Sequence, residues 1–359
     1  MIRLLTLALV AAMTGSVSAQ KQQTLHSGYP IDPVPFTSVK VTDSFWGQRL
    51  KASREVTIPL AFSKCEETGR YENFVKATHP SDEYKVGGFS FDDTDVYKTI
   101  EGASYSLQTY PDKKLEEYID SVLVIVAAAQ EPDGYLYTAR TMNPKHPHDW
   151  SGPERWSEVE NLSHEFYNLG HMVEGAVAYY QATGKRNFLD IAIRYADCVC
   201  KNIGEGPGQK RVIPGHQIAE MALVRLYTVT GDKKYLDQAQ KVYNFIFNNK
   251  NLPEDLVPYW DYDAPNIPNE PRDASAAACT ASALYELDGY LPGNHYKETA
   301  DKIMESLGSP AYRAKVGTNG NFILMHSVGS IPHGQEIDVP LNYADYYFLE
   351  GLMRKRDLE

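Results

Sequence analysis

The chain has 359 residues and a formal net charge of −12 at pH 7, which argues against nucleic acid and anionic membrane surfaces as partners. Its four cysteines, Cys65, Cys198, Cys200 and Cys279, lack metal-ligand spacing, so we expect free or core-packed thiols, no metal and no cofactor. A chain of this length buries enough surface to fold without a disulfide or a metal.

The first segment, Met1–Ala19, has the pattern of a secretory signal peptide. Arg3 precedes an apolar run over 4–13, and small residues follow up to Ala19. That run is too short to span a membrane, and no later segment approaches the ~20 apolar residues that a spanning helix needs. We therefore expect a secreted or periplasmic protein without membrane insertion, with residues 20–359 as a single domain. The sequence does not indicate an oligomeric state.

Amphipathic patterns predict a helical chain, with Pro59 bending or dividing the first helix. A polar loop is expected over 71–90, a weaker helix over 309–315, and strand character only near 322–325. The expected helices cover 45–67, 92–107, 115–130, 162–182, 187–202, 216–229, 233–248, 273–287, 296–307 and 343–355.

A repeated turn links several of these helices. In Tyr227–Leu236, Gly231 suits the left-handed end of one helix and Asp232 the start of the next, and Tyr180–Leu189 repeats the pattern. Helix hairpins that recur every ~50–70 residues stack, because one hairpin cannot bury its own apolar face. The sequence therefore predicts an all-α fold, an (α/α)6 toroid or six-hairpin barrel.

Aromatic residues are the first hint of a ligand. The chain contains 25 tyrosines and four tryptophans, which either stack on sugar rings or fill helical cores. Residues 137–158 form a long expected loop that contains histidines and tryptophans, and loops of this length usually carry function. Trp156, and Trp260 in the turn-rich segment 258–265, are the candidates for stacking on a sugar.

Acidic residues gather where helices are expected to start. Asp93 and Asp95, beside Asp92, either cap a helix or divide acid and base roles, because crowded carboxylates shift one another's pKa. Glu160 and Glu165 are the second carboxylate group. We expect Glu165→Ala to abolish turnover and leave the fold intact.

Histidines lie at the starts of two expected helices, those over 162–182 and 216–229. His164 and His171 are seven residues apart and share a helix face, whereas zinc binding favours histidines at i and i+4. Hydrogen bonding to sugar hydroxyls is the preferred interpretation of His164. His216 is likewise at an expected helix start, and Glu220 follows it four residues later.

Residues 39–227 resemble the β-L-arabinofuranosidase family of glycoside hydrolases. The shared motifs are F-W-G-Q-R-L (45–50), D-T-D-V-Y-K (93–98), E-G-A (101–103), Q-E-P-D-G-Y-L (130–136), H-E (164–165), G-H (170–171) and P-G-H (214–216). The resemblance implies an (α/α)6 barrel in which His164 and His216 contact an arabinofuranose ring. Members of the family use a cysteine nucleophile held on zinc by neighbouring Cys and Glu ligands. This chain has no adjacent cysteine pair, so we do not expect that mechanism.

Residues 228–359 are similar to the unsaturated glucuronyl hydrolases, which hydrate the C4–C5 double bond of uronides, and the resemblance changes near 228–236. The motifs are V-P-Y-W-D-Y-D-A-P (257–265), R-D-A-S-A-A-A (272–278) and E-I-D-V-P-L-N-Y-A-D-Y-Y-F-L-E (336–350). Ser327 and Ser330 match serines that touch the second sugar in some members. Arg272 is a candidate cation for the substrate carboxylate. Asp93 or Asp95 lies near the position of the first catalytic aspartate of that family, and Asn168 near the second.

The combined expectation is an exported glycoside hydrolase acting on polysaccharide-derived oligosaccharides, β-L-arabinofuranosidase-like. Asp93 or Asp95 would pair with Glu160 or Glu165 in acid–base catalysis. One alternative is an unsaturated glucuronyl hydrolase acting on lyase products. The other is a catalytically silent carbohydrate-binding relative.

Overall fold

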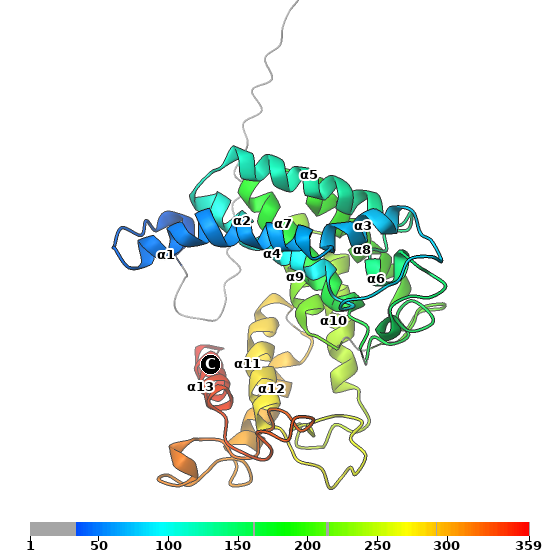
Figure 1. Ribbon diagram of the computed structural model, residues 1–359. Coiled ribbons are helices and arrows are strands. Elements are labelled where there is room, and N and C mark those ends of the chain that lie inside the picture. Colours follow the sequence, from blue (N-terminus) through cyan, green and yellow to red (C-terminus); the bar gives the residue numbers. More distant parts are fainter. Residues whose placement is uncertain (1–33, 161, 213–214, 292, 359) are drawn as a thin grey trace, which may run out of the picture. The chain divides into compact units, whose positions relative to one another are not determined.

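A computed structural model of the protein describes residues 34–160, 162–212, 215–291 and 293–358. Within these ranges every regular element is a helix, and strand pairing is limited to isolated bridges. The described chain falls into two compact units that divide between Lys250 and Asn251 (Figure 1). We call them the N-terminal unit and the C-terminal unit and describe each by itself. The expected signal peptide lies outside the described residues.

The N-terminal unit begins with a nearly continuous helical rod (Figure 1). A π-helical turn over Ser53–Thr57 separates its two α-helices, and Pro59 lies at the start of the second, so the division predicted there is confirmed. The α-helices of this unit are α1 (Trp46–Ala52), α2 (Ile58–Glu67), α3 (Arg70–Thr78), α4 (Asp93–Thr109), α5 (Lys113–Ala129), α6 (Thr138–Thr141), α7 (Glu165–Thr183), α8 (Asn187–Asn202), α9 (Ile218–Thr230) and α10 (Lys233–Phe247).

The expected loop over 71–90 is partly wrong, because α3 occupies its first half. Phe74 and Ala77 are buried on this short helix, which packs against α5. The helix has only nine residues and few apolar ones, so its own sequence gives a weak signal and packing of these side chains decides its formation. The weaker helix expected over 309–315 is also wrong, since those residues form turns and a bridge.

Helices α4, α7 and α9 form the centre of the N-terminal unit. α7 packs against both α4 and α9, α8 packs against α7, and α10 packs against α9. The faces between them bury large side chains, including Tyr97 of α4, Phe166 of α7 and Leu223 of α9. This row brings the starts of α4, α7 and α9 to neighbouring positions, which places the candidate site.

The repeated turns have the predicted geometry. Gly231 ends α9 at φ 70°, and its N–H donates to the Tyr227 carbonyl at 2.7 Å. Residues with a Cβ rarely adopt this left-handed conformation, which explains the glycine. Asp232 then accepts a hydrogen bond from the Lys234 N–H at 3.1 Å. Gly184 ends α7 in the same way.

The C-terminal unit contains α11 (Ala274–Tyr290), α12 (Tyr296–Gly308) and α13 (Asn342–Leu358), with α11 packed against the other two. Asp273 caps α11 as predicted, accepting from the Ser275 N–H at 2.9 Å. Asp301 of α12 binds Tyr285 of α11 and Lys355 of α13. Burial would raise the pKa of Asp301, but these bonds and one from Lys297 lower it to about 2.

Candidate functional site

The carboxylate of Asp93, at the start of α4, is enclosed by the protein. It is 1% exposed and accepts hydrogen bonds from the Thr138 N–H at 2.9 Å and the Thr138 hydroxyl at 2.5 Å. Burial raises the pKa of Asp93 to about 7, against the effect of both bonds from Thr138. Asp93 therefore fixes the beginning of α6 against α4.

The neighbouring carboxylates face Arg70 of α3. The guanidinium lies 3.0 Å from Asp92 and 3.0 Å from Asp95. Burial raises the pKa of Asp92, and the positive charge of Arg70 opposes that shift. Asp93 is therefore bonded to Thr138, whereas Asp92 and Asp95 form ion pairs with Arg70. Of the two aspartates at Arg70, Asp95 has the more exposed side chain.

Glu165, the first residue of α7, is fully buried and holds the long loop that precedes it. Its carboxylate accepts from the Tyr135 hydroxyl at 2.5 Å, the Ser163 hydroxyl at 2.6 Å and the Trp156 N–H at 3.0 Å. Burial raises the pKa of Glu165, while these donors favour the ionised form. Because these donors surround the carboxylate, Glu165 holds the preceding loop in position.

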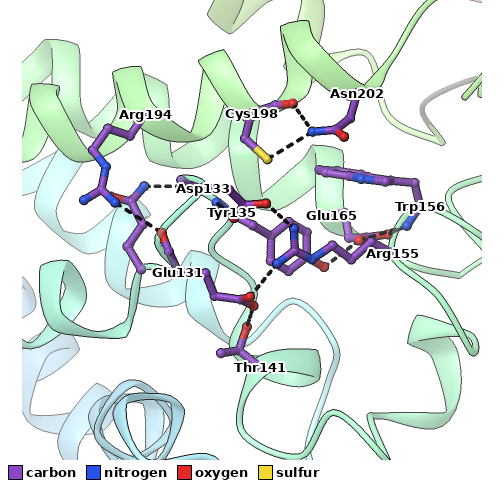
Figure 2. A network of polar contacts seen from close by, with 12 residues as sticks. Glu131, Asp133, Tyr135, Thr141, Arg155, Trp156, Glu165, Arg194, Cys198 and Asn202 are labelled. Carbon is purple, nitrogen blue, oxygen red and sulfur yellow. Dashed lines mark hydrogen bonds and ion pairs between the residues drawn. The ribbon is translucent and has the colours of Figure 1, made fainter. Parts of the chain in front are cut away.

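Figure 2 shows a network of polar contacts that extends from Glu165 to residues of α8. Arg155 pairs with Glu131 and with Asp133, the latter at 2.6 Å, and its guanidinium lies 4.0 Å from the Tyr135 ring centroid. Thr141 donates to Glu131 at 2.7 Å, and Arg194 of α8 donates to the Glu131 carbonyl at 3.1 Å. The network ties the loop between α6 and α7 to the helices on either side.

The expectation that Trp156 stacks on a sugar is not met by this geometry. Its side chain is 3% exposed and packs against Tyr135, Phe166 and Tyr195. The residue has φ 68°, a conformation that its hydrogen bond to Glu165 and this packing maintain. Trp156 thus belongs to the core under the loop. The sequence places an aromatic residue there but does not distinguish a core position from a stacking position.

His164 and His216, both predicted, do come together. Tyr167 of α7 lies beside both of them, with its ring centroid 5.6 Å from His164, 4.7 Å from His216 and 4.4 Å from His171. The His164 and His216 rings are 5.5 Å apart. We call His164, Tyr167, His171 and His216 the histidine–tyrosine cluster. Tyr167 was not among the predicted site residues, although its spacing from His164 and His171 puts it on their helix face.

The cluster is polar and partly open. The Lys98 ammonium of α4 donates to the Tyr167 hydroxyl at 2.5 Å. Burial lowers the pKa of His164, and burial together with the charge of Lys98 lowers that of His171 to about 4. The His171 imidazole is therefore neutral at pH 7 and offers one donor and one acceptor. Such groups suit sugar hydroxyls, which both donate and accept.

Three aromatic residues adjoin the cluster and were not predicted as site residues. Phe89 stacks on Phe91 at 5.0 Å, and Trp150 lies 6.3 Å from Phe89. Phe91 and Trp150 reach the cluster at His164, at 4.8 Å and 6.4 Å. We call Phe89, Phe91 and Trp150 the aromatic wall. Sequence analysis pointed to the loop of Trp150 but selected Trp156 within it.

The remaining predicted residues of the N-terminal unit lie in different surroundings. Glu160 is exposed on the loop. Asn168 is fully buried, and its amide donates to the His164 carbonyl at 2.8 Å, which supports the first turn of α7. Burial raises the pKa of Glu220 on α9 to about 7.

The candidates in the C-terminal unit are largely engaged by the protein. Arg272 pairs with Asp255 and donates to the Val257 carbonyl at 2.9 Å, so Asp255 holds this cation, while Asp273 caps α11. The Trp260 indole, only partly exposed, donates to Glu270 at 2.9 Å.

The two predicted serines of this unit differ in exposure. Ser327 is fully buried, and its hydroxyl has no hydrogen-bond partner among the described residues. Ser330 is partly exposed and contacts His333 at 2.7 Å. The Ser327 hydroxyl is therefore inaccessible to a ligand, whereas Ser330 is accessible.

The described residues do not fit the zinc–cysteine centre that the first resemblance implies. All four cysteines are free, and the described part of the chain holds no group of three or more His, Cys, Asp or Glu placed for a metal. Burial raises the pKa of Cys198 to about 11 and that of Cys200 to about 12, so both stay thiols. We derive no chemical step through such a centre.

Comparison with known proteins identifies related enzymes. The family model of the β-L-arabinofuranosidase GH127 catalytic domain matches residues 38–281. A non-reducing end β-L-arabinofuranosidase of Bifidobacterium longum is 34% identical over 225 residues, 56% of this chain and 33% of that protein. An unsaturated glucuronyl hydrolase of Formosa agariphila is 48% identical over 132 residues, 37% of this chain and 33% of that protein. The chain spans about a third of the length of these curated relatives.

Solved structures agree with the first of these families. A GH127 β-arabinofuranosidase aligns with a TM-score of 0.67 and 67% identity over 81% of this chain and 45% of its own. A GH127 β-L-arabinofuranosidase of Geobacillus stearothermophilus aligns with a TM-score of 0.62 and 27% identity, over 89% of this chain and 53% of its own. The resemblance to two families is confirmed, and so is the fold class, all-α of the (α/α)6 toroid type.

Proposed function

Because the chain belongs to the β-L-arabinofuranosidase GH127 catalytic-domain family, we propose that it is an exported β-L-arabinofuranosidase-like glycoside hydrolase. Its substrates would be oligosaccharides released from polysaccharides. The observation that carries the proposal is the histidine–tyrosine cluster. His164 and His216, the residues that the resemblance assigns to the sugar, lie 5.5 Å apart at the starts of neighbouring helices.

The roles of the carboxylates follow from their surroundings. Asp93 and Glu165 are buried and bonded to the segment between α5 and α7, which includes α6, so we assign them to positioning that segment. Asp95 and Glu160 keep exposed side chains and stay the candidates for acid–base catalysis. Tyr167 and Lys98, joined by a hydrogen bond, add further polar groups beside the histidines.

An activity assay tests this proposal. The purified chain is incubated with an aryl β-L-arabinofuranoside and, separately, with an unsaturated uronyl disaccharide whose ultraviolet absorbance reports its double bond. We expect release of the aryl group and no loss of uronyl absorbance. His216→Ala is expected to lower the rate on the arabinofuranoside. Loss of uronyl absorbance without aryl release would contradict the proposal.

Unsaturated glucuronyl hydrolase activity is the second candidate function. The 48% identity to the Formosa agariphila enzyme over 132 residues favours it. Arg272, the cation considered for a uronate carboxylate, is paired with Asp255, which weakens that part of the argument.

A catalytically silent carbohydrate-binding protein is the third candidate. The burial of Asp93 and Glu165 favours it, since both carboxylates are occupied by the protein. Binding of an oligosaccharide without hydrolysis of either test substrate would select this candidate over both enzymes.

Export is proposed from the signal pattern of Met1–Ala19. In the described residues no helix is both long and apolar enough to cross a membrane. Expression of the full chain in a bacterial host, followed by N-terminal sequencing of the periplasmic or secreted protein, is expected to give a mature end at Gln20. A cytoplasmic protein that retains Met1 would contradict export.

A further inference from the structure

The aromatic wall is the feature of the N-terminal unit that the proposed function does not yet use. Phe89, in the segment before α4, is 52% exposed. Phe91 and Trp150 are half-buried beside it. The three rings come from two loops far apart in sequence, one before α4 and one before α7.

The protein holds these rings in place. The Trp150 N–H donates to His148 Nδ1 at 3.1 Å, so the hydrogen of this imidazole is on Nε2, which donates to the Gly88 carbonyl at 3.1 Å. His148 is 9% exposed and joins the two loops through these bonds. Gly88 has φ 79°, and a Cβ at this position would lie 2.3 Å from the Asp92 carboxylate. The turn that directs Phe89 outward is thus fixed by Gly88 and His148.

The wall continues directly from the sugar site. Tyr167 adjoins His171, His164 and His216, Phe91 and Trp150 adjoin His164, and the exposed Phe89 adjoins Phe91 and Trp150. The step from the His164 ring to the Trp150 ring is 6.4 Å, comparable to one unit of an oligosaccharide. The cluster supplies hydrogen bonds, and the wall supplies apolar ring faces.

We propose that the aromatic wall binds the second sugar ring of the oligosaccharide whose terminal ring is held by the histidine–tyrosine cluster. The inference rests on the proposed function. Aromatic faces offer apolar surface on which the C–H faces of sugar rings can stack. The wall would therefore distinguish an oligosaccharide from a single sugar, with Phe89 and Trp150 as the contacts.

The test compares a ligand with one sugar ring to a ligand with two. Methyl β-L-arabinofuranoside and a β-linked L-arabinofuranosyl disaccharide are assayed with the full chain and with Phe89→Ala and Trp150→Ala. We expect each variant to lower kcat/KM for the disaccharide at least about fivefold and to change that for the methyl glycoside less than about twofold. Trp150→Phe is expected to restore much of the loss.

Trp46→Ala is the matched control. Trp46 is a 61% exposed aromatic residue on α1 of the same unit, and it packs on Phe45 rather than on the site. We expect this control to leave both substrates unchanged. Equal losses on the two substrates in the wall variants, or no loss on the disaccharide, would overturn the proposal.

Failure of the enzyme proposal is distinguishable from failure of the wall. If the wild-type chain hydrolyses neither compound, their binding is measured by saturation-transfer NMR and titration. Weaker disaccharide binding in Phe89→Ala, with methyl glycoside binding unchanged, supports the wall in a silent protein. Absence of disaccharide binding by the wild-type chain, or equal affinity in the variants, overturns it.

Discussion

Glu165 shows how burial changes the meaning of a residue found by sequence. The sequence places it beside His164 and suggests catalysis, and Glu165→Ala was expected to spare the fold. The structure places the carboxylate at 0% exposure, with hydrogen bonds from Tyr135, Ser163 and Trp156. Removing a buried acceptor leaves its donors unpaired, and each such donor costs about 1–3 kcal/mol.

We therefore expect Glu165→Ala to lower the free energy of unfolding by about 3 kcal/mol or more. Urea denaturation followed by circular dichroism measures this difference. Glu83→Ala, at an exposed position of the same unit, is the control and should stay within about 0.5 kcal/mol of wild type. A stable but inactive Glu165→Ala protein would instead return Glu165 to the catalytic candidates.

Glu220 gives a stability prediction that depends on pH. Burial raises its pKa to about 7, above the value of about 4.5 expected in the unfolded chain. The folded state therefore binds the proton more tightly, so the stability associated with this group is complete below pH ~4.5 and is lost as the pH rises through ~7.

Glu220→Gln removes that loss. We expect the variant to gain roughly 1–3 kcal/mol in free energy of unfolding relative to wild type at pH 8, and to match wild type at pH 4. Thermal or urea unfolding at the two pH values measures the effect. A difference of the same size at both pH values would show that ionisation of Glu220 is not its cause.

Only part of this site could be predicted from the sequence. His164 and His216 were identified because motif resemblance and helix-start position agree. Phe89 and Trp150 were not, because an exposed aromatic and a core aromatic such as Trp156 look alike until the packing is known. Burial is a property of the assembled loops, and no local pattern encodes it.

Three helices of the N-terminal unit are joined by a polar connection outside the histidine–tyrosine cluster. Arg225 of α9 pairs with Glu174 of α7, lies 3.9 Å from Glu101 of α4 and donates to the Tyr105 hydroxyl of α4 at 2.9 Å. Burial and the charge of Glu174 raise the pKa of Glu101. Arg225 therefore compensates two partly buried carboxylates.

Without that arginine the carboxylates would repel each other. We expect Arg225→Ala to lower the free energy of unfolding by about 1–3 kcal/mol, measured by urea denaturation. Arg211→Ala is the control, because Arg211 and Glu205 form an ion pair with side chains 63% and 77% exposed. Such surface pairs contribute about 0–1 kcal/mol. Similar losses in the two variants would mean that the position of Arg225 between the helices is unimportant.

Most helices were predictable, and the helices that were missed, α3 and α6, are short. Long segments such as α5 and α8 have enough apolar residues at helical spacing to be predicted as helices. Asp112 caps α5 by accepting a hydrogen bond from the Lys114 N–H at 2.9 Å. The short helix α3 buries only Phe74 and Ala77, so its existence depends on α5. Short elements that depend on a neighbour leave little trace in their own sequence.

At the scale of the whole molecule, the class of fold and the two family resemblances were visible in the sequence. The compact units divide between Lys250 and Asn251, close to the change of resemblance expected at 228–236, while the family match extends to residue 281. The expectation of a single domain over 20–359 stays a prediction. It could not be derived from hairpin repeats alone, because repeats determine which helices stack locally.

Binding of a sugar by the histidine–tyrosine cluster is tested by calorimetric titration with a β-linked L-arabinofuranosyl disaccharide. We expect His164→Ala and His216→Ala each to weaken binding at least about tenfold, equivalent to about 1.4 kcal/mol. His79→Ala, at an exposed histidine of the same unit, should bind as wild type does. Wild-type affinity in both cluster variants, with folding intact, would contradict the account.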